Sequence, residues 1–222
     1  MNDYEIRRSA RKTIGLSIGY GGALVVKAPF FVSRREIEAA VGSKRNWIDQ
    51  KQAEMMKHKE KYPTISFEDG QVVYYLGQSY QIAIQTGVQE SFMQANKIFL
   101  PLKKEHREQA LKSWYKKNAS EIFRKRAVYF QRQTGLNVAA VKITDAKRQW
   151  GSCSRQGNIN FSWRLAMCPP EIIDYVVLHE VIHLKHPNHS KDFYNMVEHY
   201  MSDYRARKKW LSDNRCIIDM VL

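Results

Sequence analysis

Residues 174–190 decide the fold of this chain, and they read Asp174-Tyr-Val-Val-Leu-His-Glu-Val-Ile-His-Leu-Lys-His-Pro-Asn-His-Ser190. The apolar residues of this stretch predict a buried helix from about Glu171 to a stop near Pro187. On a helix, side chains at positions i and i+4 lie on one face, so His179 and His183 can bind one Zn²⁺. Glu180 lies beside the first histidine, where it can act on a water molecule at the metal without binding the metal itself.

The third ligand of such a metal is not decided by the pair itself. A catalytic zinc takes three protein ligands and keeps one open position, and both His186 and His189 follow closely enough to complete the set. An unbroken helix would carry His186 a turn beyond the metal, whereas Pro187 ends the helix and lets His189 approach from another direction. We favour His189 and keep His186 as the alternative.

A competing interpretation treats these histidines as polar residues that interact with the dipole at a helix end. Against it, the helix that carries His179, Glu180 and His183 is otherwise apolar. Polar groups buried there without partners would be costly. The metal site is therefore the favoured interpretation.

Segments on either side of this stretch predict an α+β architecture. Lys103–Thr134 contains neither glycine nor proline, its apolar residues recur at helical spacing, and Gly135 follows as a C-cap. Val138–Thr144 and Asn158–Phe161 predict strands, joined through Arg148-Gln-Trp-Gly-Ser-Cys153. Further helices are expected over Ser190–Tyr200 and Asp203–Leu211.

The first hundred residues are expected to form a β-rich domain with one long helix. Lys12–Val26 predicts a hairpin, and Ser33 with Glu36 forms a capping box that opens a helix through about Lys61. Short strands are expected over Thr64–Phe67, Val72–Leu76 and Tyr80–Gln85. We therefore predict two domains, residues 1–100 and 101–222.

Composition narrows the class of protein. The chain has 222 residues, 44% of them hydrophobic, which excludes intrinsic disorder, and its longest apolar runs are too short for a membrane span. The N-terminal residues lack the apolar run of a secretory signal, and the three cysteines include no Cys-x-x-Cys. We expect a cytoplasmic protein that does not bind membranes.

Charge is concentrated in one part of the chain. The formal net charge of +14 divides into +4 for residues 1–100, +9 for residues 101–150 and +1 for residues 151–222. A positive field of this kind attracts polyanions. The basic segment 101–150 is either a contact surface for nucleic acid or nucleotides, or a solvated face that keeps the protein soluble.

Several other residues are weaker candidates for chemistry. Cys153 could be a ligand or nucleophile, but without a partner motif a packed or edge-strand cysteine is favoured. Trp150 and Trp163 are interpreted as residues of the core or cleft wall rather than base-stacking platforms. By residue type, the candidates for stabilising an oxyanion are Arg148, Tyr175 and Tyr204.

The stretch from His179 to Phe193 resembles the YgjP-like metallopeptidase family, which is related to SprT-like zinc proteins. Further landmarks of that family follow in the same order along the chain: Arg7-Arg-Ser-Ala-Arg11 with the following hairpin, Tyr75-Leu-Gly-Gln-Ser-Tyr80, Trp150-Gly-Ser-Cys153, Trp163-Arg-Leu165 and Trp210-Leu211. One departure is Tyr194, where a tryptophan is common, and we expect it to affect the packing behind His189 rather than the chemistry.

The resemblance implies a minimal zincin core, in which the edge strand of a small sheet flanks the cleft above the zinc helix. It also implies His179, His183 and His189 as zinc ligands and Glu180 as general base. The expected function is hydrolysis of peptide or amide bonds in a protein or peptide substrate. The alternatives are a metal-dependent hydrolase of nucleotides or other phosphoesters, and a nucleic-acid-associated protein whose metal site is vestigial.

Overall fold

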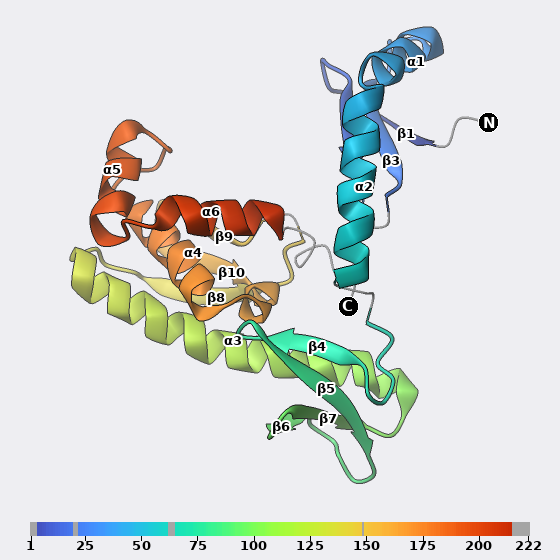
Figure 1. Cartoon of the computed structure of the whole chain (residues 1–222). Helices are drawn as coiled ribbons and strands as arrows, with labels where there is room; N and C mark the ends of the chain where they lie inside the picture. The colour runs from blue at the N-terminus through green and yellow to red at the C-terminus, as the bar shows by residue number, and fades with distance from the viewer. Residues whose placement is uncertain (1–3, 20–21, 62–64, 148, 215–222) are drawn as a thin grey trace. The chain divides into compact units, whose positions relative to one another are not determined.

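The computed structural model describes residues 4–19, 22–61, 65–147 and 149–214 (Figure 1). The chain folds as two compact units, Met1–Thr64 and Ile65–Leu222. The second unit therefore begins before the boundary at residue 100 that the sequence suggested. Among the described helices, none is both long enough and apolar enough to cross a membrane.

The first unit is a three-stranded sheet with two helices. Its strands are β1 (Tyr4–Ser9), β2 (Gly15–Ile18) and β3 (Leu24–Pro29), in the order β1-β3-β2. The pair β2–β3 is the predicted hairpin, and β1 lies parallel to β3. The core contains Val26, Ala28 and Ile37, none of which is exposed to solvent.

The predicted long helix of this unit is two helices, α1 (Arg34–Ser43) and α2 (Arg45–Lys61). The capping box is present, since Ser33 Oγ accepts from the Glu36 amide and the Glu36 carboxylate accepts from the Ser33 amide. The break falls at Lys44, whose φ of −111° and ψ of 15° are not helical. Gly42 and Ser43 precede it, and both have low helix propensity, so the chain turns there.

The second unit begins with a four-stranded sheet, β4 (Val72–Tyr75), β5 (Gln78–Gln85), β6 (Phe92–Gln94) and β7 (Lys97–Pro101), in the order β4-β5-β7-β6. The sequence predicted β4 and β5 but neither β6 nor β7. The prediction of a strand at Thr64–Phe67 is wrong for Ile65–Phe67, while Thr64 lies outside the described residues. Phe67 has a positive φ of 60°, which interrupts an extended strand.

Helix α3 (Lys104–Thr134) is the long axis of the second unit, and Gly135 ends it at a φ of 71°, as predicted. It contacts strand β7, the short 3₁₀ helix η1 (Trp163–Met167), strand β8 (Ala140–Thr144) and helix α4 (Pro170–Ile182). The buried face is largely aromatic; Tyr115 and Phe123, for example, are fully enclosed. Burying each such side chain contributes about 1.5–3 kcal/mol, so this face of α3 stabilises its packing against β7, β8, η1 and α4.

The basic segment that contains α3 is partly neutralised within the fold. Twelve of its thirteen basic side chains lie in the part of the chain that the structure describes, and six of these form ion pairs with acidic residues: Lys104, Arg107, Lys112, Lys117, Lys125 and Arg126. The strongest geometry is the bidentate pair in which Arg126 donates to both oxygens of Asp174 at 2.5 and 2.7 Å. Part of the positive charge of this segment therefore links α3 to α4 through ion pairs and is not available to bind a polyanion.

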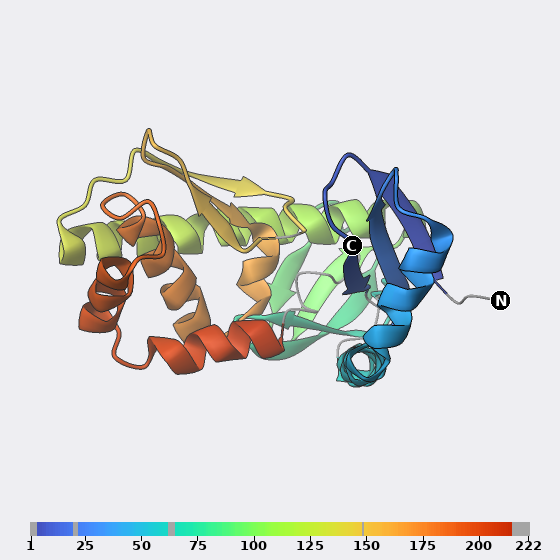
Figure 2. The same ribbon diagram turned by 90° about the horizontal axis from the view of Figure 1, so that it is seen from above.

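The second sheet of this unit carries the strand that lies against the predicted metal-binding helix. It contains β8, β9 (Gly151–Cys153) and β10 (Asn158–Ser162) in the order β8-β10-β9, so β9 is an edge strand. Figure 2 shows this sheet and helices α4, α5 (Lys191–Tyr200) and α6 (Tyr204–Asp213) on either side of the long axis of α3. Helix α4 contacts β9, so the predicted metal helix lies against the edge strand.

A charge cluster around the fully buried Arg164 fixes this arrangement. Asp145 follows β8 and accepts hydrogen bonds from Arg164 Nη1 at 2.6 Å and Trp163 Nε1 at 2.9 Å, and it pairs with Lys112 Nζ at 2.5 Å. Burial raises the pKa of Asp145, but the hydrogen bonds from Lys112, Arg164 and Trp163 outweigh it and hold the pKa well below its usual range. The cluster ties β8 to α3 and η1.

Candidate metal centre

Helix α4 presents the predicted histidine pair on one face. Pro170 occupies its first turn, and the side chains from Ile172 to Ile182 are mostly buried. His179 Nε2 and His183 Nε2 lie 3.2 Å apart. The helix ends at Ile182 with His183 as its C-cap, earlier than the predicted stop near Pro187. The i, i+4 relationship of the two histidines is preserved.

His189 reaches the same point from a different segment. Its Nε2 atom lies 2.9 Å from His179 Nε2, and the ligand nitrogens of the three histidines lie within 4.8 Å of one another. Ser190 caps α5 directly after His189 by accepting a hydrogen bond from the Phe193 amide at 3.3 Å. The cap fixes the chain direction immediately beyond the third histidine.

Phe193 is the packing support of the group. It is fully buried, and its ring centroid lies 4.8, 4.6 and 5.0 Å from those of His179, His183 and His189. One aromatic side chain therefore contacts all three imidazoles and restricts their rotation. This role was not predicted from the sequence, although the serine cap three residues earlier indicates where helix α5 begins.

His186, the alternative third ligand, is not a member of the group of potential metal ligands found among the described residues. Its backbone carbonyl instead lies 3.0 Å from His183 Nδ1, in position to accept a hydrogen bond. A contact of this kind fixes the tautomer of a histidine and leaves Nε2 free to bind a metal. His186 thus contributes through its main chain.

The protonation states suit a cation. Burial lowers the pKa of His179 to about 3, with further lowering by His183, His189 and Lys208, and burial likewise lowers the pKa of His189. These imidazoles are neutral near pH 7, so their nitrogen lone pairs are available. The buried Nδ1 of His179 has no hydrogen-bond partner in the described part of the chain, which leaves Nε2 as the functional nitrogen.

The spacing of the nitrogens fits a small tetrahedral metal ion. Zinc–imidazole bonds of about 2.0–2.1 Å place tetrahedral ligand nitrogens about 3.4 Å apart. The observed distances of 3.2 Å between His179 and His183 and 2.9 Å between His179 and His189 are close to this value. The donor set therefore fits a metal such as zinc, and it contains no carboxylate.

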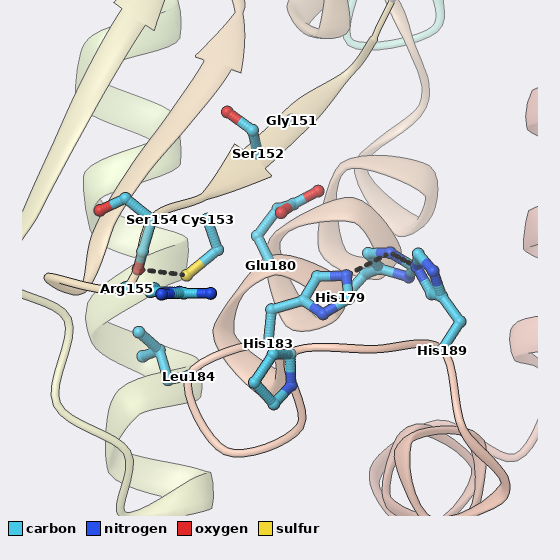
Figure 3. Close-up of a pocket in the computed structure, with 11 residues that line it drawn as sticks. Gly151, Ser152, Cys153, Ser154, Arg155, His179, Glu180, His183, Leu184 and His189 are labelled. Carbon is cyan, nitrogen blue, oxygen red and sulfur yellow. Dashed lines mark hydrogen bonds between the residues drawn. The ribbon is translucent and has the colours of Figure 1, made fainter.

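Glu180 lies beside the histidines in a pocket of about 460 Å³ (Figure 3). The side chain is only 6% exposed, and burial raises its pKa to about 8. It packs directly on the backbone of the edge strand: a Cβ atom on Gly151 would lie 2.8 Å from both Glu180 Cγ and Oε1. The glycine of Trp-Gly-Ser-Cys is thus required by the position of the carboxylate.

The edge strand forms the opposite wall of the same pocket. Gly151, Ser152, Cys153, Ser154 and Arg155 all line it. Burial, and secondarily the charge of Glu180, raise the pKa of the Cys153 thiol to about 11, so it is a neutral edge-strand cysteine rather than a nucleophile. Trp163 is fully buried and belongs to the core.

Neither of the two tyrosine candidates for oxyanion stabilisation lines this pocket. Arg148 lies outside the described residues. Tyr175 is 4% exposed and packs edge-to-face on His179 at 5.8 Å, and burial raises its pKa. Tyr204 is buried and stacks on Tyr194, whose ring stacks in turn on His189 at 6.1 Å. Tyr194 and Tyr204 therefore form a stack behind His189, which is the packing position expected for Tyr194, while Tyr175 supports His179.

An α+β unit with a His-Glu-x-x-His helix, a third histidine and an edge strand over the pocket has the architecture of a minimal zincin. A family model described as the YgjP-like metallopeptidase domain matches residues 12–214, and the chain belongs to this family. A comparison with curated proteins found no match. The family assignment identifies the chain as a metal-dependent peptidase in general terms.

Proposed function

We propose that this chain is a zinc-dependent peptidase in which His179, His183 and His189 hold the metal and Glu180 is the general base. The observation that carries the proposal is the convergence of three Nε2 atoms beside a buried carboxylate in one pocket. Three neutral nitrogen ligands with no carboxylate are typical of catalytic zinc sites with an open position. A structural site would have no use for a base such as Glu180.

A zinc ion bound there would supply a Lewis acid, which polarises a carbonyl group and lowers the pKa of water to about 7. Glu180 accepts a proton from the attacking water molecule and returns it to the leaving amine. Burial alone raises the Glu180 pKa to about 8. A nearby dication favours the ionised carboxylate, so the group can act as a base near neutral pH.

The edge strand supports an extended peptide as the substrate. β9 pairs with β10 on one side only, and its residues line the pocket. The free main-chain groups of an edge strand can pair with an added strand, which would hold a peptide bond beside Glu180.

The decisive experiment measures zinc content and hydrolysis together. The wild type and Glu180→Gln are compared on casein, short peptides and nucleoside triphosphates. We expect one zinc per chain in both proteins and roughly a 100-fold or greater loss of peptide hydrolysis in the variant, as for removal of a general base. Full activity of Glu180→Gln would refute the mechanism, and hydrolysis of triphosphates but not peptides would refute the substrate class.

A matched pair of variants tests the ligand set. His183→Ala should lose zinc, because it removes one of the three converging nitrogens. His186→Ala should retain zinc, because its contribution is a backbone carbonyl that alanine keeps. Loss of zinc from His186→Ala would show that the third ligand has been assigned wrongly, and retention of zinc by His183→Ala would show that the helical pair does not hold the metal.

A further inference from the structure

Among the residues that the structure describes, Arg155 is the one lysine or arginine that lines the pocket with Glu180 and the histidines. It follows β9 in the turn to β10 and is exposed. In Figure 3 its side chain lies beside Cys153, and its guanidinium points toward the part of the pocket that holds Glu180 and the histidines. The metal-binding pocket therefore has a cationic group at the end of its edge-strand wall.

The charge of Arg155 is not neutralised within the fold. No acidic side chain in the described ranges forms an ion pair with it. Other arginines of this unit are paired: Arg107 with Glu68, Arg126 with Asp174 and Arg164 with Asp145. A guanidinium offers planar donors that match a carboxylate, and those of Arg155 remain available to a ligand.

The backbone that carries Arg155 is held in place. Three hydrogen bonds close the turn: Ser154 N to Asn158 O at 2.9 Å, Gly157 N to Ser154 O at 3.0 Å, and Asn158 N to Ser154 Oγ at 3.2 Å. Gly157 has a φ of +78°, a conformation that glycine adopts readily. The turn therefore presents Arg155 from a defined backbone position, which lowers the entropic cost of binding.

We propose that Arg155 makes this peptidase selective for substrates with a carboxylate near the scissile bond. The inference rests on the proposed function and names its substrate class. Arg155 lies two residues beyond the end of β9, in the turn to β10, and it lines the same pocket as Glu180. A carboxylate that it binds would therefore lie within a few residues of the cleaved bond.

Two sources can supply such a carboxylate: the side chain of an aspartate or glutamate, and the C-terminal carboxylate of the substrate. A neutral peptide with blocked ends is the common scaffold for both. In one arm, two peptides that differ only in having glutamate or glutamine at one position are compared, for each of four positions on either side of the cleaved bond. In the other arm, the same neutral peptide carries either a free C-terminal carboxylate or an amide at matching lengths.

The zinc-loaded wild type, Arg155→Gln, Arg155→Glu and the control Arg132→Gln are compared, with zinc content measured for each. Arg132 is an exposed arginine on α3 that does not line the pocket. For one of these peptide pairs, we expect the wild type and the control to cleave the carboxylate peptide with a kcat/KM roughly five- to tenfold higher than that of its neutral partner. The ratio falls to about one in Arg155→Gln, and Arg155→Glu prefers a lysine at that position instead, with zinc content unchanged.

A wild-type ratio of one at every position, or a ratio that persists in Arg155→Gln, would overturn the proposal. Binding of the same peptides to zinc-loaded Glu180→Gln, followed by fluorescence anisotropy, gives a second readout. If no peptide is hydrolysed by the wild type, the proposed function fails, while an Arg155-dependent difference in Kd still upholds carboxylate recognition. Arg155-dependent binding of a single-stranded oligonucleotide, with no preference among the peptides, would assign the anion as phosphate and overturn the carboxylate assignment.

Discussion

The contact between Gly151 and Glu180 makes the replacement Gly151→Ala the sharpest test of the site geometry. The added Cβ would lie 2.8 Å from Glu180 Cγ and Oε1 and 3.0 Å from Cδ. Non-bonded carbon atoms prefer about 3.5–4.0 Å, so a displacement of about 1 Å is needed. Because β9 is held by its pairing with β10, the Glu180 side chain is the part that gives way.

A displacement of about 1 Å at a catalytic group can cost about 100-fold in rate, equivalent to about 2.7 kcal/mol of barrier. We expect kcat to fall by about this factor while KM changes little and the zinc stoichiometry stays at one, since the ligands are not contacted. Steady-state kinetics on a quenched fluorescent peptide and metal analysis of the same preparation measure these quantities. Urea denaturation should show a stability loss of about 1–3 kcal/mol from overpacking.

The matched control is Gly42→Ala in helix α1, where an added Cβ meets nothing within 4 Å. This variant should keep full activity and zinc. If Gly151→Ala also kept full kcat with full zinc, the reasoning that the glycine positions Glu180 would be refuted. Loss of zinc together with activity would instead show that β9 supports the ligands.

Three further predictions concern stability and metal binding. Phe193→Leu should weaken zinc binding in a chelator competition, because the buried ring that contacts all three imidazoles is lost. Asp145→Asn should lower the free energy of unfolding by about 1–2 kcal/mol at pH 7, since it leaves the fully buried Arg164 without its carboxylate, while the exposure of Asp145 to solvent screens part of the loss. Because the folded-state pKa of Asp145 is held well below its value in the unfolded chain, its contribution is complete above about pH 5 and declines progressively below about pH 4, so the difference between the urea midpoints of wild type and variant should narrow as the pH is lowered from 5 to 3. Ser33→Ala should cost about 1 kcal/mol within the first unit, seen as faster hydrogen exchange in α1, with zinc content unchanged.

The candidate ligands were predictable because the signal is local. The i, i+4 spacing of His179 and His183 follows from helix geometry alone, and Pro187 indicates that the chain leaves the helix before His189. The α3 boundaries were likewise visible, since Lys104–Thr134 lacks helix breakers and ends at a glycine. The sequence favoured His189 over His186 without deciding between them, because the direction of the chain after the helix depends on packing.

Most of the helices, the α+β class and the residue types available for a metal were predictable from the sequence, because helix periodicity, caps and ligand spacing are properties of neighbouring residues. The break between α1 and α2 was not predicted. The residues that approach this set from distant parts of the chain are visible in the folded structure alone. It brought Gly151 against Glu180, Phe193 under three imidazoles and Arg155 into the pocket. It also paired part of the basic charge of residues 101–150 with acidic side chains such as Asp145 and Asp174. These contacts join segments far apart in the sequence, and their energy depends on distances that no local pattern encodes.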